Sequence, residues 1–77
     1  MSQIQRFLIE RITVDLIETY MTEFQVNFDK AASTVFFSEL HSKLTDPETG
    51  LYMDSSTSIY ELFKFELKNG AFLQYEQ

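Results

Sequence analysis

Residues 3–24 read QIQRFLIERITVDLIETYMTEF, and this stretch decides the fold class. It contains neither glycine nor proline, the two residues that most often interrupt a helix. Its apolar residues recur at helical spacing, so it predicts one helix over about Gln3 to Phe24. In the C-terminal half of this helix a broad apolar stripe is expected, made up of Leu16, Ile17, Tyr20, Met21 and Phe24.

The apolar face of this helix changes direction along its length. In its first turns Ile4, Phe7 and Leu8 point nearly opposite to the stripe of the second half. A straight helix cannot bury both stripes against one neighbour. The sequence therefore predicts an interaction patch at Ile4, Phe7 and Leu8, unless residues 51–53 or the tail, residues 71–77, cover it.

Two further helices are predicted, over about residues 28–43 and 56–68. Asn27 can accept hydrogen bonds from the first backbone N–H groups of the helix over residues 28–43. Gly70 can take the left-handed conformation that often ends a helix, as expected after residues 56–68. Their predicted core-facing residues are Phe28, Ala32, Val35, Phe36 and Leu40 in the first and Ile59, Tyr60, Phe63 and Leu67 in the second.

The segment between these two helices has the composition of an ordered turn. Pro47 fixes its φ angle, Asp46 can bond the backbone that follows it, and Gly50 permits a positive φ. The fold class expected is all-α: a small three-helix bundle formed by a single domain, residues 1–77, with this turn between the second and third helices. The tail, residues 71–77, is apolar enough to dock on this bundle or to add a short strand, and its polar ends favour fraying.

Composition and charge exclude several classes of site. Among the 77 residues there is no cysteine, which removes disulfides, thiolate zinc sites and cysteine nucleophiles and favours a reducing cytoplasm. No apolar run approaches the roughly 20 residues of a membrane span, and no signal-peptide pattern is present. The net charge is −6 and the six basic residues are scattered, which disfavours binding to nucleic acid or to an acidic membrane.

Candidate chemical residues are few. His41 is the only histidine, and no nucleophile adjoins it in a catalytic pattern, so a partly exposed surface histidine is expected. Asp46, Glu48 and Asp54 do not have the spacing of a calcium loop and are expected to serve the turn. We therefore predict no catalytic residue, no metal site and no cofactor. Phe65, which falls on the polar face of the third helix, is a candidate partner contact.

One motif carries a resemblance. Residues 43–52 read KLTDPETGLY and are followed by Ser55 and by IYELF at residues 59–63. This order resembles a group of short, uncharacterised bacterial helical proteins with a D-x-x-T-G-L-Y turn, often encoded near toxin-like or mobile-element genes. The resemblance implies an antitoxin-like or accessory role and brings no catalytic residues.

Together these observations predict a non-enzymatic protein–protein interaction module. We expect it to bind a protein partner or itself, as a homodimer, through Ile4, Phe7 and Leu8. Two alternatives stay open: an acidic inhibitor that mimics nucleic acid, suggested by the net charge, and a small enzyme that uses His41 or the turn carboxylates.

Overall fold

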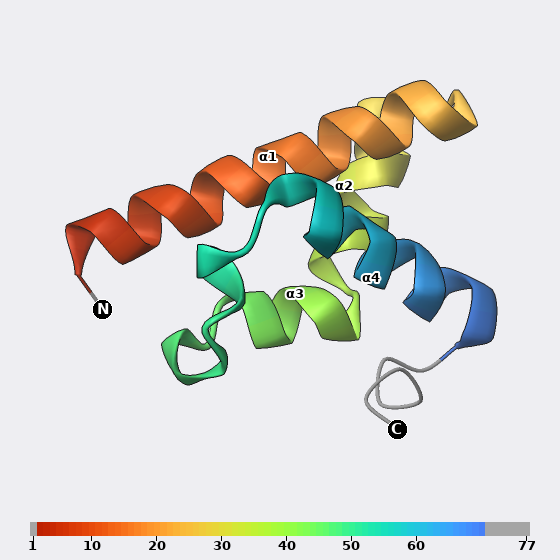
Figure 1. Cartoon of the computed structure of the whole chain (residues 1–77). Coiled ribbons are helices and arrows are strands. Elements are labelled where there is room, and N and C mark those ends of the chain that lie inside the picture. Colours follow the sequence, from red (N-terminus) through yellow and green to blue (C-terminus); the bar gives the residue numbers. More distant parts are fainter. Residues whose placement is uncertain (1, 71–77) are drawn as a thin grey trace.

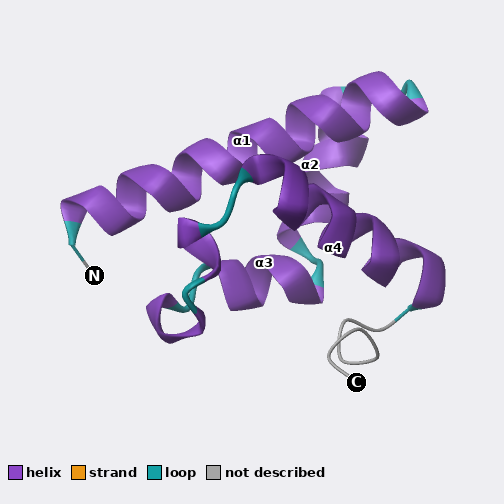
Figure 2. Cartoon of the chain, in the orientation of Figure 1, coloured by secondary structure: helices purple, strands orange, loops and turns teal. Residues whose placement is uncertain are grey.

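Helices make up most of the computed structural model, which describes residues 2–70 (Figures 1 and 2). The elements in chain order are α1 (Gln3–Phe24), α2 (Phe28–Phe36), α3 (Glu39–Leu44), the 3₁₀ turns η1 (Pro47–Thr49) and η2 (Leu51–Met53), and α4 (Ser56–Asn69). No strand occurs within this range, so the all-α class is confirmed. The predicted docking of the tail, residues 71–77, lies outside the described residues.

Helix α1 runs along one side of the molecule, and the three shorter helices all pack on the same side of α1 (Figure 1). Its bounds are those predicted from the sequence. Ser2 and Gln5 form a capping box, in which the Ser2 hydroxyl accepts from the Gln5 N–H at 3.1 Å and the Gln5 side chain accepts from the Ser2 N–H at 2.9 Å. The helix ends at Gln25, which has a left-handed conformation with φ 54°.

The core lies between α1 and the shorter helices. Its buried apolar members are Ile9, Ile12, Leu16, Ile17, Ala31, Val35, Leu40, Leu44, Ile59, Tyr60 and Phe63. The prediction for α1 was partly wrong, because Ile9 and Ile12 are buried whereas Phe24, expected in the core stripe, is about half exposed. The buried face of α1 is thus rotated towards Ile12 and away from Phe24.

The predicted helix over residues 28–43 is two helices, so the three-helix bundle is corrected to four α-helices within residues 2–70. The chain turns at Phe37 and Ser38, where Ser38 is extended, with ψ 153°. The Ser38 hydroxyl donates to the Val35 carbonyl at 2.6 Å and accepts from the His41 N–H at 3.1 Å. One side chain therefore bonds the end of α2 and the start of α3, which makes the break locally stable.

The Glu66 carboxylate on α4 also stabilises the break between α2 and α3. The Glu66 oxygens accept from the Glu39 N–H at 2.7 Å and from the Leu40 N–H at 2.8 Å. These N–H groups open α3 and have no partner within that helix, and a carboxylate is favoured at this positive end. Glu66 therefore fixes the position of α3 relative to α4.

The segment after α3 forms the two 3₁₀ turns η1 and η2. The Asp46 side chain accepts from the Glu48 N–H at 3.1 Å, and Gly50 has φ 71°. In η2, Tyr52 is partly buried, and its hydroxyl accepts from the Gln5 side-chain amide at 2.9 Å. The turn thus brings η2 against the N-terminal half of α1.

Helix α4 is bonded to the far end of α1. The Tyr60 hydroxyl donates to the Glu23 carboxylate at 2.5 Å, and Lys64 Nζ lies 3.3 Å from the same carboxylate. The hydrogen bond from Tyr60 lowers the pKa of Glu23, and burial together with this bond raises the pKa of Tyr60. The two bonds align α4 with the C-terminal half of α1.

Replacing Gly50 with valine is expected to lower the free energy of unfolding by about 1 kcal/mol or more, because a β-branched residue is strained at positive φ. A Cβ at Gly50 would meet no heavy atom within 4 Å, so the cost comes from the backbone conformation and not from a clash. Urea denaturation measures it. Asp46→Asn is the control and should cost much less, since asparagine also bonds a turn backbone. Equal costs for the two variants would contradict this account.

Replacing Glu66 with alanine is expected to lower the free energy of unfolding by about 1–3 kcal/mol, because two N–H groups at the start of α3 lose a charged acceptor. The matched control is Glu61→Ala on the same helix, whose carboxylate makes only a 3.9 Å surface contact with Lys64. Urea denaturation of both variants distinguishes them. A Glu66→Ala protein as stable as Glu61→Ala would show that the carboxylate does not hold the break.

Candidate functional site

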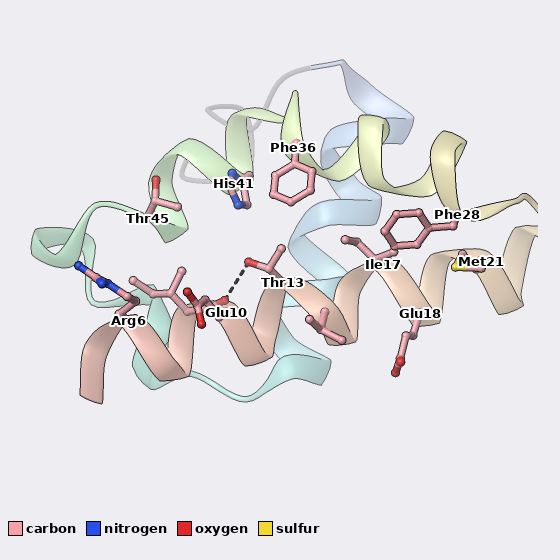
Figure 3. A pocket seen from close by; sticks show the side chains of 12 residues that line it. Arg6, Glu10, Thr13, Ile17, Glu18, Met21, Phe28, Phe36, His41 and Thr45 are labelled. Carbon is pink, nitrogen blue, oxygen red and sulfur yellow. Dashed lines mark hydrogen bonds between the residues drawn. The ribbon is translucent and has the colours of Figure 1, made fainter. Parts of the chain in front are cut away.

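The described residues form an apolar groove between α1 and the α2–α3 pair, with a volume of about 930 Å³ (Figure 3). We call it the α1–α2 groove. Its lining is Arg6, Ile9, Glu10, Thr13, Val14, Ile17, Glu18, Met21, Phe28, Phe36, His41 and Thr45. Figure 3 shows the rings of Phe28 and Phe36 in the space between α2 and α1, with Met21 below Phe28. Apolar rings therefore form the α2 wall of the groove, and Arg6, Glu10, Thr13 and Glu18 add polar groups along its α1 wall.

Three apolar side chains of this groove are more exposed than buried. The exposed fraction is 51% for Val14, 59% for Phe28 and 53% for Phe36. Full burial of such a side chain is favourable by about 1.5–3 kcal/mol. The groove thus leaves a substantial apolar surface in contact with water, as binding surfaces do.

The packing of α2 explains why its phenylalanines are exposed. Phe28 and Phe36 were predicted to face the core, and this prediction was wrong. Ala31 and Val35 are the fully buried residues of α2, and they bring its backbone close to α1. The larger rings lie to the side of this contact and line the groove instead.

His41 lies at the polar end of the α1–α2 groove, near Arg6 and Thr45 (Figure 3). Its ring meets the ring of Phe36 edge-on, with centroids 5.0 Å apart. Burial lowers the pKa of His41 below its usual 6.5, because desolvation disfavours the imidazolium. The predicted surface histidine is thus half-buried in a groove wall.

The three residues of the predicted patch at the start of α1 differ in their exposure. Ile4 and Phe7 are exposed, at 72% and 61%, whereas Leu8 is half-buried beside Tyr52 of η2. Phe65 is half-buried on α4 and does not line the groove. The structure therefore does not bring the four predicted interaction residues together.

Sequence reasoning missed Val14, Phe28 and Phe36 as site residues. A signal for Val14 was present, because Phe7, Val14 and Met21 are seven residues apart and share one face of α1. For Phe28 and Phe36 an apolar helical pattern was visible, but it does not distinguish a core from a groove wall.

The turn carboxylates do not line the α1–α2 groove with His41. Asp46 bonds the turn backbone, and Asp54 borders a different hollow, beside Tyr52. Within residues 2–70, no group of three histidines or carboxylates is placed to hold a metal ion. No described helix combines the length and apolar character that crossing a bilayer requires.

No protein-family model matches the chain, and comparisons with curated proteins and with solved structures also find no match. The resemblance to short bacterial helical proteins therefore stays a prediction. The function is inferred from the α1–α2 groove.

Acidification is expected to destabilise the wild type more than a His41→Gln variant. Because the pKa of folded His41 lies below the 6.5 of the unfolded chain, the unfolded state binds more protons as the pH falls through this range. Stability from His41 is thus complete above pH 6.5 and declines below it. Urea denaturation of both proteins at neutral pH and at about pH 5 measures the difference. An identical loss in the two proteins would contradict it.

Proposed function

We propose that this protein is a non-enzymatic protein–protein interaction module and that the α1–α2 groove is its binding surface. The observation that carries the proposal is the exposure of Val14, Phe28 and Phe36 around one continuous apolar groove. A chain of 77 residues has little stability to spare, so a surface of this kind is retained for a purpose.

The shape of the groove favours a helix as its occupant. It runs along α1 from Arg6 to Met21, a span of about four helical turns. An amphipathic helix can lay its apolar face into such a groove, with anchors at positions i, i+3 or i+4 and i+7. Arg6, Glu10 and Glu18 supply charges at its borders, which would set the orientation of the bound helix.

The alternatives have less support. His41 and the turn carboxylates, which do not line the α1–α2 groove together, give no acid–base pair on which to base an enzyme. Mimicry of nucleic acid is suggested only by the net charge of −6, while the most distinctive surface is apolar. The antitoxin-like role implied by the resemblance is one form of the proposed function, and we extend it no further.

Replacing Val14 with glutamate is expected to abolish protein association, because it places a carboxylate in the middle of the apolar surface. The matched control is Thr22→Glu, which adds the same charge at an exposed position of α1 outside the groove. Light scattering of the purified proteins measures self-association. Affinity capture from the native host, with tagged versions of all three proteins, measures other partners.

We expect the wild type and Thr22→Glu to associate alike and Val14→Glu to lose association by at least about tenfold. Circular dichroism of each protein controls for folding. Association that survives in a folded Val14→Glu protein would contradict the proposal, as would a wild type that binds neither itself nor another protein.

A further inference from the structure

We infer that the occupant of the α1–α2 groove is a basic amphipathic helix of another protein, which places lysine or arginine side chains beside Glu10 and Glu18. This inference rests on the proposed function and names the chemistry of the partner. Three observations support it: the charges of the groove lie on one wall, its two carboxylates have no ion-pair partner among the described residues, and the whole chain is acidic.

The fixed charges of the groove all come from α1. The wall from α2 and α3 consists of side chains without a fixed charge, namely Phe28, Phe36, His41 and Thr45. Burial lowers the pKa of His41, so this imidazole is neutral at neutral pH. The α1 wall carries Arg6, Glu10 and Glu18. A bound helix therefore meets uncharged side chains on one flank and charged ones on the other.

Two carboxylates flank the exposed apolar side chain of Val14. Glu10, Val14 and Glu18 are spaced four residues apart and are all exposed, so they follow one edge of α1. Both glutamates line the groove on its α1 side (Figure 3). A rise of about 1.5 Å per residue puts each of them roughly one turn from Val14 along the helix axis. A helix packed over Val14 therefore covers a carboxylate on either side of this contact.

Neither carboxylate is neutralised within residues 2–70. The two ion pairs in this range both involve Lys64, so Glu10 and Glu18 have no basic partner there. A helix that covers them displaces their water, which costs free energy unless an opposite charge takes its place. Lysine and arginine supply that charge, and their long stems also cover apolar surface. An acidic helix would instead be repelled at both positions.

The charge of the whole chain acts in the same direction. Arg6 is the one basic residue of the groove lining, and one arginine against two glutamates leaves a negative charge of one. The chain as a whole carries −6. A negative field attracts a basic partner and speeds its encounter with the groove. A second copy of this chain carries the same −6 and is repelled, which favours a different protein as the occupant.

Three labelled synthetic peptides of about 16 residues, which match the length of the groove along α1, test the inference. The first has leucine on one helical face and lysine on the other. The second has glutamate in place of lysine, and the third has the composition of the first in an order without an apolar face. Fluorescence anisotropy at physiological salt measures the dissociation constants. We expect the wild type to bind the lysine peptide at least about tenfold more tightly than the other two.

Charge reversal locates the binding. The double variant Glu10→Lys/Glu18→Lys is expected to weaken binding of the lysine peptide by about tenfold or more and to strengthen binding of the glutamate peptide. The matched control, Glu48→Lys/Glu61→Lys, makes the same change in net charge at exposed positions that do not line the groove. It should change the affinity by no more than about twofold, because salt screens distant charges.

Val14→Glu separates binding in the groove from general attraction. It makes the protein more acidic, so a purely electrostatic attraction to the lysine peptide would become stronger. We expect binding to be weakened by about tenfold or more instead, because the new carboxylate interrupts the apolar contact. Circular dichroism verifies that every variant is folded.

The contrary results distinguish this inference from the proposed function. A glutamate peptide that binds more tightly than the lysine peptide, and is lost with Val14→Glu, overturns the basic partner and leaves the proposed function standing. A wild type that binds no peptide but forms a dimer abolished by Val14→Glu does the same, since the second copy is then the occupant. A lysine peptide that binds equally well after Val14→Glu, or in the scrambled order, lies outside the groove and overturns the inference. A wild type that binds no peptide and no protein overturns both.

Discussion

The contact between the Glu66 carboxylate and the first N–H groups of α3 is the constraint on which the rest of the structure depends. It stabilises the break after α2, because the groups that a continuous helix would bond internally are bonded by another helix instead. The break lets α2 and α3 lie at different angles to α1. Phe36 and His41, one from each helix, then meet on the same wall of the α1–α2 groove. A straight helix through residues 28–43 could not form this wall.

The apolar residues of α2 are divided between the core and the groove. Ala31 and Val35 take the buried positions of α2, and the larger Phe28 and Phe36 stay exposed. A fold that placed the two rings inside would gain more from burial, by roughly half of the about 1.5–3 kcal/mol that full burial of an exposed ring provides. The bulky residues thus line the groove, and the small ones lie where the helices approach closely.

Local features could be predicted from the sequence, and distant ones could not. The bounds of α1, the cap at Asn27 and the positive φ of Gly50 depend on neighbouring residues, so residue type and spacing indicated them. The break after α2 is capped locally by Ser38, but it is also held by Glu66, which lies 27 residues from Glu39 in the chain, and no local pattern indicates that second pairing. The groove likewise depends on contacts between residues that are far apart in the chain. The stripe of Phe7 and Val14 was readable in α1, but which rings of α2 would face it depends on how α2 packs.

The Gln5 side chain links the first turn of α1 to η2. Its side-chain oxygen accepts from the Ser2 N–H and its amide nitrogen donates to the Tyr52 hydroxyl, so a single planar group joins the first turn of α1 to η2. If η2 detaches, the amide loses the contact that fixes its plane, and the cap at Ser2 weakens with it. We therefore expect the start of α1 and the 3₁₀ segment to open together in local unfolding, although 47 residues of chain separate them.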